Sequence, residues 1–556
     1  MKKFYLRFLL LAVGVANAQE VQWQKNIPSN TQDFLSNMTS TIDRQILLSG
    51  SSIQSQKTEG GSQKQNNGYD YHILKLDQQG SKVWEKYFGG TRHDYLTSSI
   101  TTQEGGFVIS GTSFSNMSGE KKENNLGGSD VWLLRLNENG EELWQKTLGT
   151  KSNDEASAVV QSTDFGFFVA GNINDNKKLF GSKDVFVSKL DKDGKLIQTT
   201  ILGGKSLDEV TDMIPTPDGG AVVLVYSTSG RAENLNNAET QHSAQNNNPQ
   251  SSNTQNETAR LELISTVKTF IGKSEQTFGE GDYWIIKLDK NAHIEWQKTY
   301  GGSGDDRPKS IAYTENGYLI AGESRSNSSG NKKENVKEGT DIWVLSLDKS
   351  GNEIWQKNYN FGNRDVAMSL DVIRKTNKDN FSEDRGFLLG GYTQAEEKVK
   401  KDDEKFWMLY IDTNGKEEWR KYVEGKEKKN EERLVSAKLQ SDGTYLLAGT
   451  SAEELGQENW KIVKLGDKQL DDLIENKDIR IYPNPVTDYA YVEIGLDFEN
   501  ADIYLYDMTG KIVQELQTKN MVTKVNTSKL PQGVYVIKVN IPTQQNKKLT
   551  TKIVKE

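Results

Sequence analysis

The eleven tryptophans of this chain occupy two positions of one repeated sequence unit. Six stand in the phrase x-W-x-K or its relatives: Trp23, Trp84, Trp144, Trp296, Trp355 and Trp419. Five stand in or close to the phrase D-x-W-h-h-x-L, where h is apolar: Trp132, Trp284, Trp343, Trp407 and Trp460. A large ring that recurs at equivalent repeat positions indicates packing between the units. We therefore expect one large repeat body.

The repeat has a period of roughly 60 residues and contains four strand-like segments. Clear copies of its hairpin start at Asp70, Asp130, Asp282 and Asp341, and fainter copies start at Asp184, Lys405 and Glu458. A second phrase, G-h-h-h-G, recurs once in each unit between the hairpins. Four antiparallel strands repeated seven times predict a seven-bladed, all-β propeller over residues 19–466.

The repeat begins in the middle of a unit. Val21 to Lys25 reads as the last strand of a unit, and the final unit stops after Trp460 to Leu465, one strand short. Pairing of these two segments would complete the seventh blade with the N-terminal strand and remove two sheet edges. We therefore expect the two ends of the repeat region to form one sheet.

Composition limits the classes of partner and of site. An apolar content of 34% with 49 Gly and 9 Pro suits many thin β-layers joined by turns. The net charge of -9 argues against a nucleic acid partner, because phosphate binding needs a concentrated basic surface. The chain has no cysteine, which excludes disulfides, thiol nucleophiles and thiolate metal sites.

The first residues read as a secretory signal peptide at 1–18. Lys2 and Lys3 supply its positive end, Phe8 to Val15 its apolar stretch, and Ala16 to Ala18 the small residues before cleavage. The apolar stretch is too short to span a bilayer, and no later segment is apolar enough. The sequence predicts an exported chain without a transmembrane segment.

The phrase L-D-x-x-G-x-x-x-W, repeated through the propeller region, resembles the repeats of quinoprotein-like propellers. The resemblance covers scaffold positions only. It supports the fold and carries over none of that family's quinone or calcium ligands.

The repeat motifs end before a polar link at 467–478, and different sequence motifs follow it. Residues 479–556 contain IYPNPVTDYAYVEI, ADIYLYDMTGKIV, VNTSKLPQGVYVIKV and LTTKIVKE, in that order. These phrases resemble the type A C-terminal sorting domain of the type IX secretion system of Bacteroidota. Its motif residues here are Tyr482, Pro483, Asn484, Pro485, Asp507, Gly510, Lys511, Leu530, Pro531, Gly533 and Tyr535. The resemblance implies a small β-sandwich that the secretion machinery recognises, and delivery through the periplasm to the outer cell surface or the medium.

The sequence gives weaker evidence for a ligand site than for the fold or the sorting domain. The loops between the second and third strands of a unit, and between successive units, share one face and vary in length; the longest is an insertion in blade 4 at 229–279, rich in Asn, Gln and Ser. One carboxylate stands near the start of each innermost strand: Asp33, Asp94, Asp154, Asp208, Asp305, Asp365 and Glu431. These carboxylates could form an acidic rim that attracts calcium or a cationic partner. Alternatively, each could accept hydrogen bonds from its own turn.

Signals for catalysis are weak, and we assign no catalytic or cofactor-binding residue. The four histidines occur singly, although a Ser-His-Asp set could still assemble in space. We expect a binding or surface-interaction module for an extracellular protein or glycan. The alternatives left open are a propeller enzyme that acts on extracellular polysaccharide, a quinone-dependent oxidoreductase, and a purely structural role in a surface layer.

Overall fold

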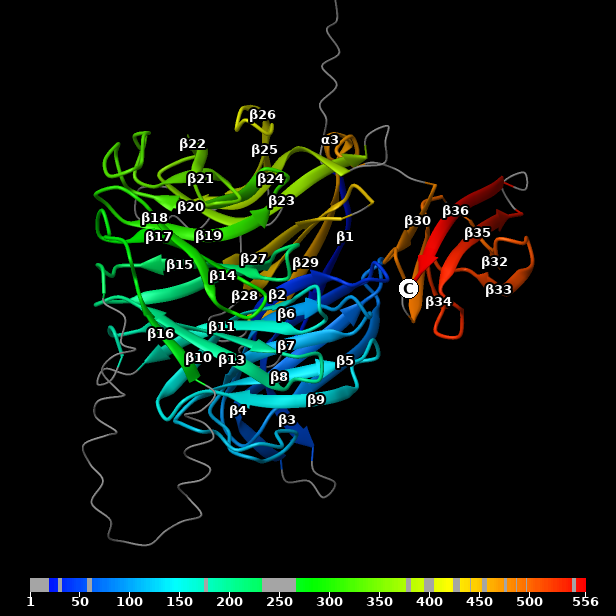
Figure 1. Cartoon of the computed structure of the whole chain (residues 1–556), viewed down its shortest axis with the longest axis horizontal. Coiled ribbons are helices and arrows are strands. Elements are labelled where there is room, and N and C mark those ends of the chain that lie inside the picture. The colour runs from blue at the N-terminus through cyan, green and yellow to red at the C-terminus, as the bar shows by residue number, and fades with distance from the viewer. Residues whose placement is uncertain are drawn as a thin grey trace, which may run out of the picture.

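The regular secondary structure of the described residues is almost entirely β-strand (Figure 1). The computed structural model describes residues 20–28, 33–57, 63–174, 179–232, 267–376, 382–394, 405–423, 431–440, 442–452, 458–474, 478–486, 488–496, 498–542 and 547–556. The predicted signal peptide and residues 233–266 of the insertion predicted at 229–279 lie outside these ranges. One short helix, α3 (Lys468–Asp471), is present in the described part of the chain.

The described residues before α3 form seven sheets, and each contains four antiparallel strands. The first sheet contains β2 (Phe34–Ser40), β3 (Ile46–Lys57), β4 (Gln63–Leu76) and β5 (Lys82–Phe88), and the second contains β6 (Asp94–Thr101), β7 (Phe107–Ser113), β8 (Asp130–Leu136) and β9 (Glu142–Leu148). The third contains β10 (Asn153–Gln161), β11 (Phe167–Asn174), β12 (Asp184–Leu190) and β13 (Leu196–Gly203), and the fourth contains β14 (Asp208–Pro215), β15 (Ala221–Ser227), β17 (Asp282–Leu288) and β18 (Ile294–Tyr300). The fifth contains β19 (Asp306–Tyr313), β20 (Gly317–Ser324), β21 (Asp341–Asp348) and β22 (Glu353–Tyr359), and the sixth contains β23 (Arg364–Thr376), β24 (Ser382–Gln394), β25 (Lys405–Ile411) and β26 (Glu417–Val423). The seventh contains β27 (Glu431–Leu439), β28 (Tyr445–Ala452), β29 (Glu458–Gly466) and β1 (Glu20–Ile27).

The seventh sheet joins the two ends of the repeat region. Strand β1 pairs antiparallel with β29, with Val21 opposite Leu465 and Ile27 opposite Trp460. The pairing predicted from the offset start of the repeat is therefore present. The first strands of successive sheets contact one another from β2 through β6, β10, β14, β19, β23 and β27, and β27 in turn contacts β2. We call these seven sheets the seven-sheet body.

One addition was not predicted. Strand β16 (Val267–Gly272), which follows the insertion, pairs parallel with β13 and gives the third sheet a fifth strand at its outer edge.

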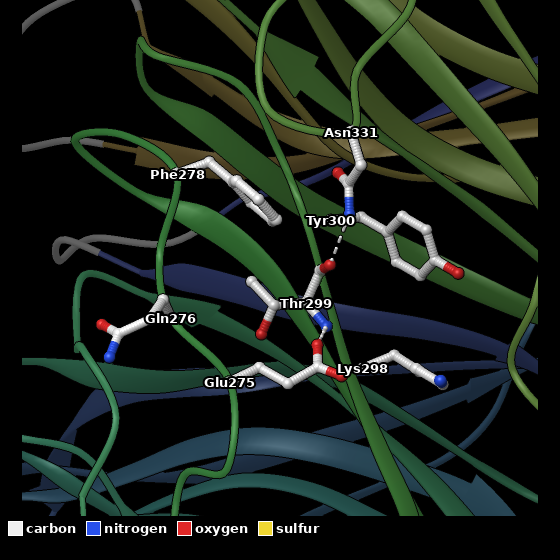
Figure 2. A pocket seen from close by; sticks show the side chains of 7 residues that line it. All are labelled: Glu275, Gln276, Phe278, Lys298, Thr299, Tyr300 and Asn331. Carbon is white, nitrogen blue, oxygen red and sulfur yellow. Dashed lines mark hydrogen bonds between the residues drawn. The ribbon is translucent and has the colours of Figure 1, made fainter.

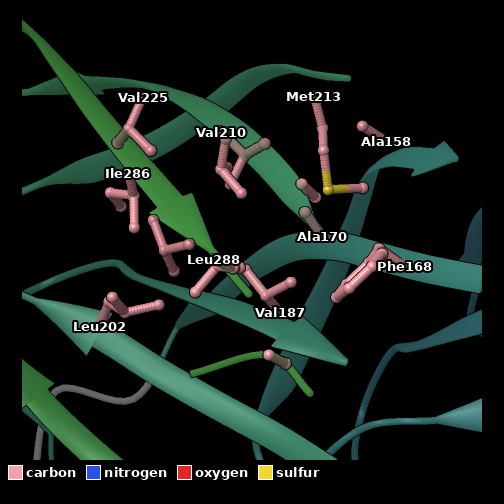
Figure 3. Close-up of a cluster of buried hydrophobic side chains, with 14 of the residues drawn as sticks. Ala158, Phe168, Ala170, Val187, Leu202, Val210, Met213, Val225, Ile286 and Leu288 are labelled. Carbon is pink, nitrogen blue, oxygen red and sulfur yellow. The ribbon is translucent and has the colours of Figure 1, made fainter. Parts of the chain in front are cut away.

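The core of the body lies between neighbouring sheets. The second and third strands of most sheets are buried on both faces, as in β7 and β8. Figure 3 shows the contact between the third and fourth sheets, where Phe168 and Val187 face Val210, Met213 and Ile286. Such long apolar strands suit sheets that are covered on both sides, because neither face can remain in water.

The two classes of tryptophan pack differently. Trp132, Trp284, Trp343, Trp407 and Trp460, which lie on third strands, are among the largest fully buried side chains. Five of the six fourth-strand indoles, all but that of Trp419, instead lie against the glycine of a turn in the next sheet. These pairs are Trp23 with Gly80, Trp84 with Gly140, Trp144 with Gly194, Trp296 with Gly351, and Trp355 with Gly415. The Trp23 pair joins the seventh sheet to the first, and the indole Nε1 of Trp23 also donates to the carbonyl of Gln78 at 3.0 Å.

Residues after 477 form a separate β-sandwich. A three-stranded sheet contains β30 (Ile479–Tyr482), β31 (Tyr489–Ile494) and β34 (Val522–Asn526), and a four-stranded sheet contains β33 (Ile512–Thr518), β32 (Ala501–Tyr506), β35 (Gly533–Ile541) and β36 (Lys547–Lys555). The two sheets share one apolar core that includes Val492, Ile503 and Ile537. In Figure 1 the three-stranded sheet lies on the side toward the seven-sheet body, and β32 and β33 lie farthest from it.

The segment predicted as a polar link begins with packed structure. The carboxylate of Asp467 caps α3 by accepting from the backbone N–H of Gln469, and it pairs with Lys421. Leu470 and Leu473 enter the apolar cluster between the sixth and seventh sheets. The seven-sheet body therefore extends to about Leu473, because these two leucines bury apolar surface against it.

Candidate binding surface on the loop face

The loops that precede the first and third strands of each sheet lie at one end of the seven-sheet body, because antiparallel strands alternate in direction. We call this end the loop face. It carries a cluster of rings from the first and second sheets, which we call the aromatic patch: Phe34, Tyr69, His93, Tyr95 and Phe114.

The rings of the aromatic patch contact one another in a chain. Tyr69 is central, with its ring centroid 5.2 Å from Phe34, 5.3 Å from Tyr95 and 5.7 Å from His93. His93 and Tyr95 stack at 5.5 Å with an angle of 10° between their planes, and Phe114 meets Tyr95 edge-on. His93 is exposed and Phe34 is 40% exposed, whereas Tyr69, Tyr95 and Phe114 are half-buried. The patch is therefore a surface feature and not part of the core.

Repeat geometry explains why these rings meet. Phe34 and Tyr95 both follow a buried aspartate at the start of a first strand, and Tyr69 directly precedes the aspartate that starts a third-strand repeat. The same three positions in the third and fourth sheets hold Glu155, Glu209 and Lys183. There, the Lys183 ammonium lies 3.0 Å from Glu155 and 2.8 Å from Glu209, an arrangement that we call the charged bridge.

The charged bridge stabilises the ammonium form of Lys183. Burial opposes the charge on Lys183, but the hydrogen bonds to Glu209 and Glu155 outweigh it and raise the pKa of Lys183. The same end of the fourth and fifth sheets adds another polar group. Tyr226 Oη donates to Asp305 Oδ1 at 2.7 Å, and Arg307 bonds the other oxygen of Asp305 at 2.7 Å while lying over the Tyr226 ring.

The predicted rim carboxylates are mostly not on this surface. Asp94, Asp154, Asp208 and Asp365 are fully buried and Asp33 is nearly so. Asp94 Oδ2 accepts from the backbone N–H of Gly90 at 2.8 Å and from Ser115 Oγ at 3.0 Å, and Asp208 accepts from Gly204, Ser227 and Ser229. These carboxylates therefore accept hydrogen bonds from the turn before the first strand and from serines at or after the end of the second strand. No group of three or more acidic or histidine side chains in the described ranges is arranged to hold a metal ion.

Two predicted rim positions, Asp305 and Glu431, differ from the other five. In the fifth sheet the residue equivalent to Asp94 is Asp306 and not Asp305, because Asp306 accepts from Gly302, Ser324 and Ser326. Two adjacent aspartates made the register ambiguous in the sequence. Glu431 is the first residue of β27, and its side chain lies outside the described ones.

The aspartates that start the third strands were not among the predicted site residues. Asp282 lies under the loop that precedes β17, where its Oδ2 accepts from the backbone N–H of Phe278 at 2.6 Å. Burial, reinforced by the nearby charge of Asp306, raises the pKa of Asp282 to about 7. The signal was present in the sequence as the repeated aspartate of the D-x-W phrase, but only the structure brings it close to the aspartate of the next sheet.

A serine, a histidine and a glutamate do assemble in space. Ser52 Oγ lies 2.7 Å from His72 Nδ1, and His72 Nε2 lies 2.9 Å from Glu85 Oε1. However, Ser52 and His72 are each 3% exposed, and the imidazole is stacked on Tyr87 and Trp460. No substrate can reach this serine in the folded chain, so the three groups form a buried polar network and not a hydrolytic site.

A shallow groove lies between the loops of the fourth and fifth sheets (Figure 2). Glu275, Phe278, Thr299, Tyr300 and Asn331 are among its lining residues. Glu275 accepts from the backbone N–H of Thr299, Asn331 donates to the carbonyl of Thr299, and Tyr300 donates to the carbonyl of Gly351. These hydrogen bonds hold neighbouring loops together.

The sorting-domain motif residues occupy three places. Asn484, between Pro483 and Pro485, bonds the main chain of β36 through both ends of its amide, and Tyr482 faces the seven-sheet body. Asp507 closes an exposed turn by accepting from Thr509 and Lys511, with Gly510 at φ 84°. Leu530, Pro531, Gly533 and Tyr535 form the entry to β35, where Tyr535 Oη donates to the carbonyl of Pro531 at 2.8 Å.

Residues 480–556 match the family described as a secretion system C-terminal sorting domain. The chain therefore ends in a type IX secretion sorting domain, as the resemblance of its phrases predicted, and it is directed to the cell surface or secreted. None of the helices that the structure describes is long and apolar enough to cross a membrane. No curated protein matches the sequence.

Several solved structures are similar to this chain at low identity. A protein of unknown function from Dyadobacter fermentans matches with 9% identity and a TM-score of 0.38, over 81% of this chain and 99% of that chain. PorZ, a surface component of the type IX secretion system of Porphyromonas gingivalis, matches with 9% identity and a TM-score of 0.24, over 95% and 82%. A Synechocystis apocarotenoid oxygenase matches with 9% identity and a TM-score of 0.35, over 90% and 97%. At these TM-scores the similarities carry no argument about activity.

Proposed function

We propose that this chain is an exported glycan-binding protein whose seven sheets work as a seven-bladed β-propeller, closed by the N-terminal strand. Its ligand site is the aromatic patch on the loop face, with the charged bridge beside it. The sorting domain delivers the propeller to the outer surface, where the loop face meets its ligand.

The observation that carries this proposal is the position of the aromatic patch. Five rings contact one another on an exposed face, and three of them, Phe34, Tyr69 and Tyr95, stand at repeat positions that hold charged residues in the third and fourth sheets. The core does not need these rings, because the equivalent sheets fold with Glu155, Lys183 and Glu209 in their places. Exposed apolar side chains that gather in one patch mark interaction sites more often than single ones do.

The chemistry of the surface favours a glycan. A pyranose ring has an apolar face of C–H groups and a rim of hydroxyls, so it needs ring faces together with hydrogen-bonding groups. Tyr69, Tyr95 and His93 supply rings that carry polar atoms, and Lys183 and Glu155 lie on the neighbouring sheet. A nucleic acid ligand is disfavoured by the net charge of -9.

Binding is favoured over glycan cleavage. A glycosidase usually needs one protonated carboxylic acid and one ionised carboxylate at the scissile bond. Glu155 and Glu209 both accept a hydrogen bond from the Lys183 ammonium. These two carboxylates therefore serve a salt bridge between the third and fourth sheets, and Ser52 and His72 are too buried to meet a substrate.

The test is binding of the full chain, without its signal peptide, to an array of bacterial and host extracellular glycans. We expect Tyr69→Ala and Tyr95→Ala each to weaken binding to the best glycan by about tenfold or more, because one lost stacking contact is worth roughly 1.4 kcal/mol. Tyr422→Ala is the matched control, since Tyr422 is an exposed tyrosine of the sixth sheet outside the patch. Binding that is equal in the patch variants and the unsubstituted chain would exclude this site.

A further inference from the structure

The sorting domain rests against the seven-sheet body through one face of its three-stranded sheet. In this sheet Tyr482, Tyr491 and Lys524 are direct cross-strand neighbours, and Glu493 lies two residues beyond Tyr491 on the same face of β31. The opposite face, with Ala490 and Val492, is buried in the sandwich core. Alternation along the strands therefore separates a core face from a polar and aromatic face.

That polar and aromatic face meets three turns of the first and second sheets. The turns contain Ile42 to Arg44, Glu104 to Gly105, and Glu138. They lie at the end of the seven-sheet body opposite the loop face, because they follow first and third strands. Docking here therefore leaves the aromatic patch uncovered.

The contacts are specific and partly buried. Arg44 pairs with Glu493, and their side chains are 13% and 4% exposed. Lys524 Nζ lies 2.6 Å from Glu138 Oε2, and Tyr482 Oη donates to the carbonyl of Ile42 at 3.0 Å. Removing one partner of a buried ion pair leaves the other charge buried without compensation, which is strongly destabilising. The Arg44–Glu493 pair therefore favours docking between these two surfaces over docking to a surface that lacks the opposite charge.

Tyr491 fits a position where the body has no side chain. A Cβ added to Gly105 would lie 2.0 Å from Tyr491 Oη, and Gly105 has a φ of 95°. The ring of Tyr491 stacks on Tyr482 at 6.0 Å, and Lys524 lies over the ring of Tyr489 at 4.2 Å. Burial raises the pKa of both Tyr482 and Tyr491 above the ordinary value, as expected for hydroxyls within an interface.

The other sheet of the sorting domain presents apolar side chains to solvent. Met508, Ile512, Val534 and Val554 are exposed, and Val534 and Val554 are direct cross-strand neighbours on β35 and β36. Met508 belongs to the turn closed by Asp507, next to Gly510 and Lys511. Figure 1 places β32 and β33, which flank this turn, on the side away from the seven-sheet body.

We propose that the three-stranded sheet of the sorting domain is a docking face for the chain's own seven-sheet body, and that the four-stranded sheet is the face left for the export machinery. Tyr482, although part of the first sorting phrase, then serves the internal contact. The Asp507 to Lys511 turn and the apolar side chains around it serve recognition by a protein of the secretion system. This inference does not depend on the glycan site.

Docking can be tested by crosslinking in the full chain, which has no native cysteine. In the double variant Glu138→Cys with Lys524→Cys, a short bismaleimide should join the two domains, while Glu138→Cys with Lys511→Cys should stay unlinked. Adding Arg44→Glu should reduce the crosslink at least fivefold, and adding Glu493→Arg as well should restore it. No crosslink at the first pair, or equal crosslinking at both pairs, would overturn the docking.

Recognition can be tested by export from a cell with a type IX system. Met508→Asp combined with Val534→Asp should reduce the exported fraction at least tenfold while the Glu138–Lys524 crosslink still forms, which shows that the sorting domain remains folded. Normal export of this variant would overturn the assignment of the four-stranded sheet. If Glu493→Arg abolished export and the addition of Arg44→Glu did not restore it, the assignment of the four-stranded sheet would also be overturned. The secretion machinery would then bind the docking face.

Discussion

The indole of Trp144 lies directly against Gly194, so that a Cβ added to this glycine would come within 3.0 Å of the ring. Trp144 belongs to the second sheet and Gly194 to the turn between the third and fourth strands of the third. The same pairing of an indole with a turn glycine links most neighbouring sheets, including the seventh with the first. The fourth strand of the third sheet lacks a tryptophan, and the next turn carries Ala292 at φ 63° in place of glycine.

This exception predicts the effect of two opposite substitutions. Gly194→Ala should lower the free energy of unfolding by about 1–3 kcal/mol, because the methyl group meets the indole and the φ of 80° is strained for alanine. Ala292→Gly, the matched change at the equivalent turn, should alter it by less than about 1 kcal/mol. Chemical denaturation of both variants checks the difference, and equal effects would mean that the indole contact contributes nothing.

Removal of the N-terminal strand should destabilise the whole seven-sheet body. Deleting Glu20 to Ile27 exposes the edge of β29 and removes the contact of Trp23 with Gly80. We expect the melting temperature to fall by more than it does for Trp23→Ala alone, because the deletion loses the strand ladder as well as the indole. Calorimetry of the two variants gives the comparison. An unchanged melting temperature in the deletion variant would contradict closure by β1.

The buried carboxyl of Asp282, which lies close to Asp306, should make the free energy of unfolding depend on pH. With its pKa raised to about 7, folded Asp282 keeps a proton that the unfolded chain loses near the ordinary value of 3.8. The folded state then binds more protons than the unfolded state between about pH 4 and 7, so the contribution of Asp282 to stability falls as pH rises through this window. Asp282→Asn should flatten this part of the pH profile of the melting temperature.

Asp218 offers a contrast of opposite sign. Burial opposes ionisation there, but hydrogen bonds from Thr216 and Lys287 lower the pKa of Asp218 below 3.8. Its contribution is present above the unfolded pKa and is lost as pH falls through the folded value. Asp218→Asn should therefore leave the slope of the melting temperature against pH unchanged between pH 5 and 7, because this window begins about one pH unit above the ordinary pKa of an aspartate. Identical profiles for Asp282→Asn and the unsubstituted chain would refute the role of Asp282.

The buried serine network should resist a serine-directed reagent. A fluorophosphonate probe should not label Ser52 in the folded chain, because Ser52 and His72 are almost fully enclosed. His72→Phe should lower the free energy of unfolding by about 1–3 kcal/mol, since Ser52 and Glu85 lose their shared partner. Mass spectrometry of the treated protein measures the labelling. Stoichiometric labelling of Ser52 would reopen the hydrolase alternative.

Deletion of the sorting domain should separate folding from delivery. A chain ending after Leu473 keeps all seven sheets and α3, so we expect a cooperative melting transition. The same chain should remain in the periplasm, because the type IX sorting domain at 480–556 is missing. Cell fractionation gives the location. Surface delivery of the shortened chain at the normal level would contradict the role of the domain.

Local patterns in the sequence were enough to predict the strands and the sorting domain. Alternating apolar residues, turn glycines and the recurring Trp23 and Trp460 phrases located the strands and the pairing of β1 with β29, because periodicity and turn chemistry are local properties. The sorting domain was also legible, since its phrases are contiguous. The sequence left the seven carboxylates open between an exposed rim and hydrogen bonding at the turn, because burial cannot be read from a local pattern, and the structure buries Asp94 and Asp208.

Contacts between residues far apart in the sequence could be seen only in the folded chain. Phe34, Tyr69 and Tyr95 lie on three strands of two sheets, and their contact depends on how those sheets turn against each other. Arg44 and Glu493 come from opposite ends of the chain, and no local signal marks either residue as a partner. Packing between sheets and docking between domains are set by the whole assembly of apolar surfaces, which no single stretch of sequence contains.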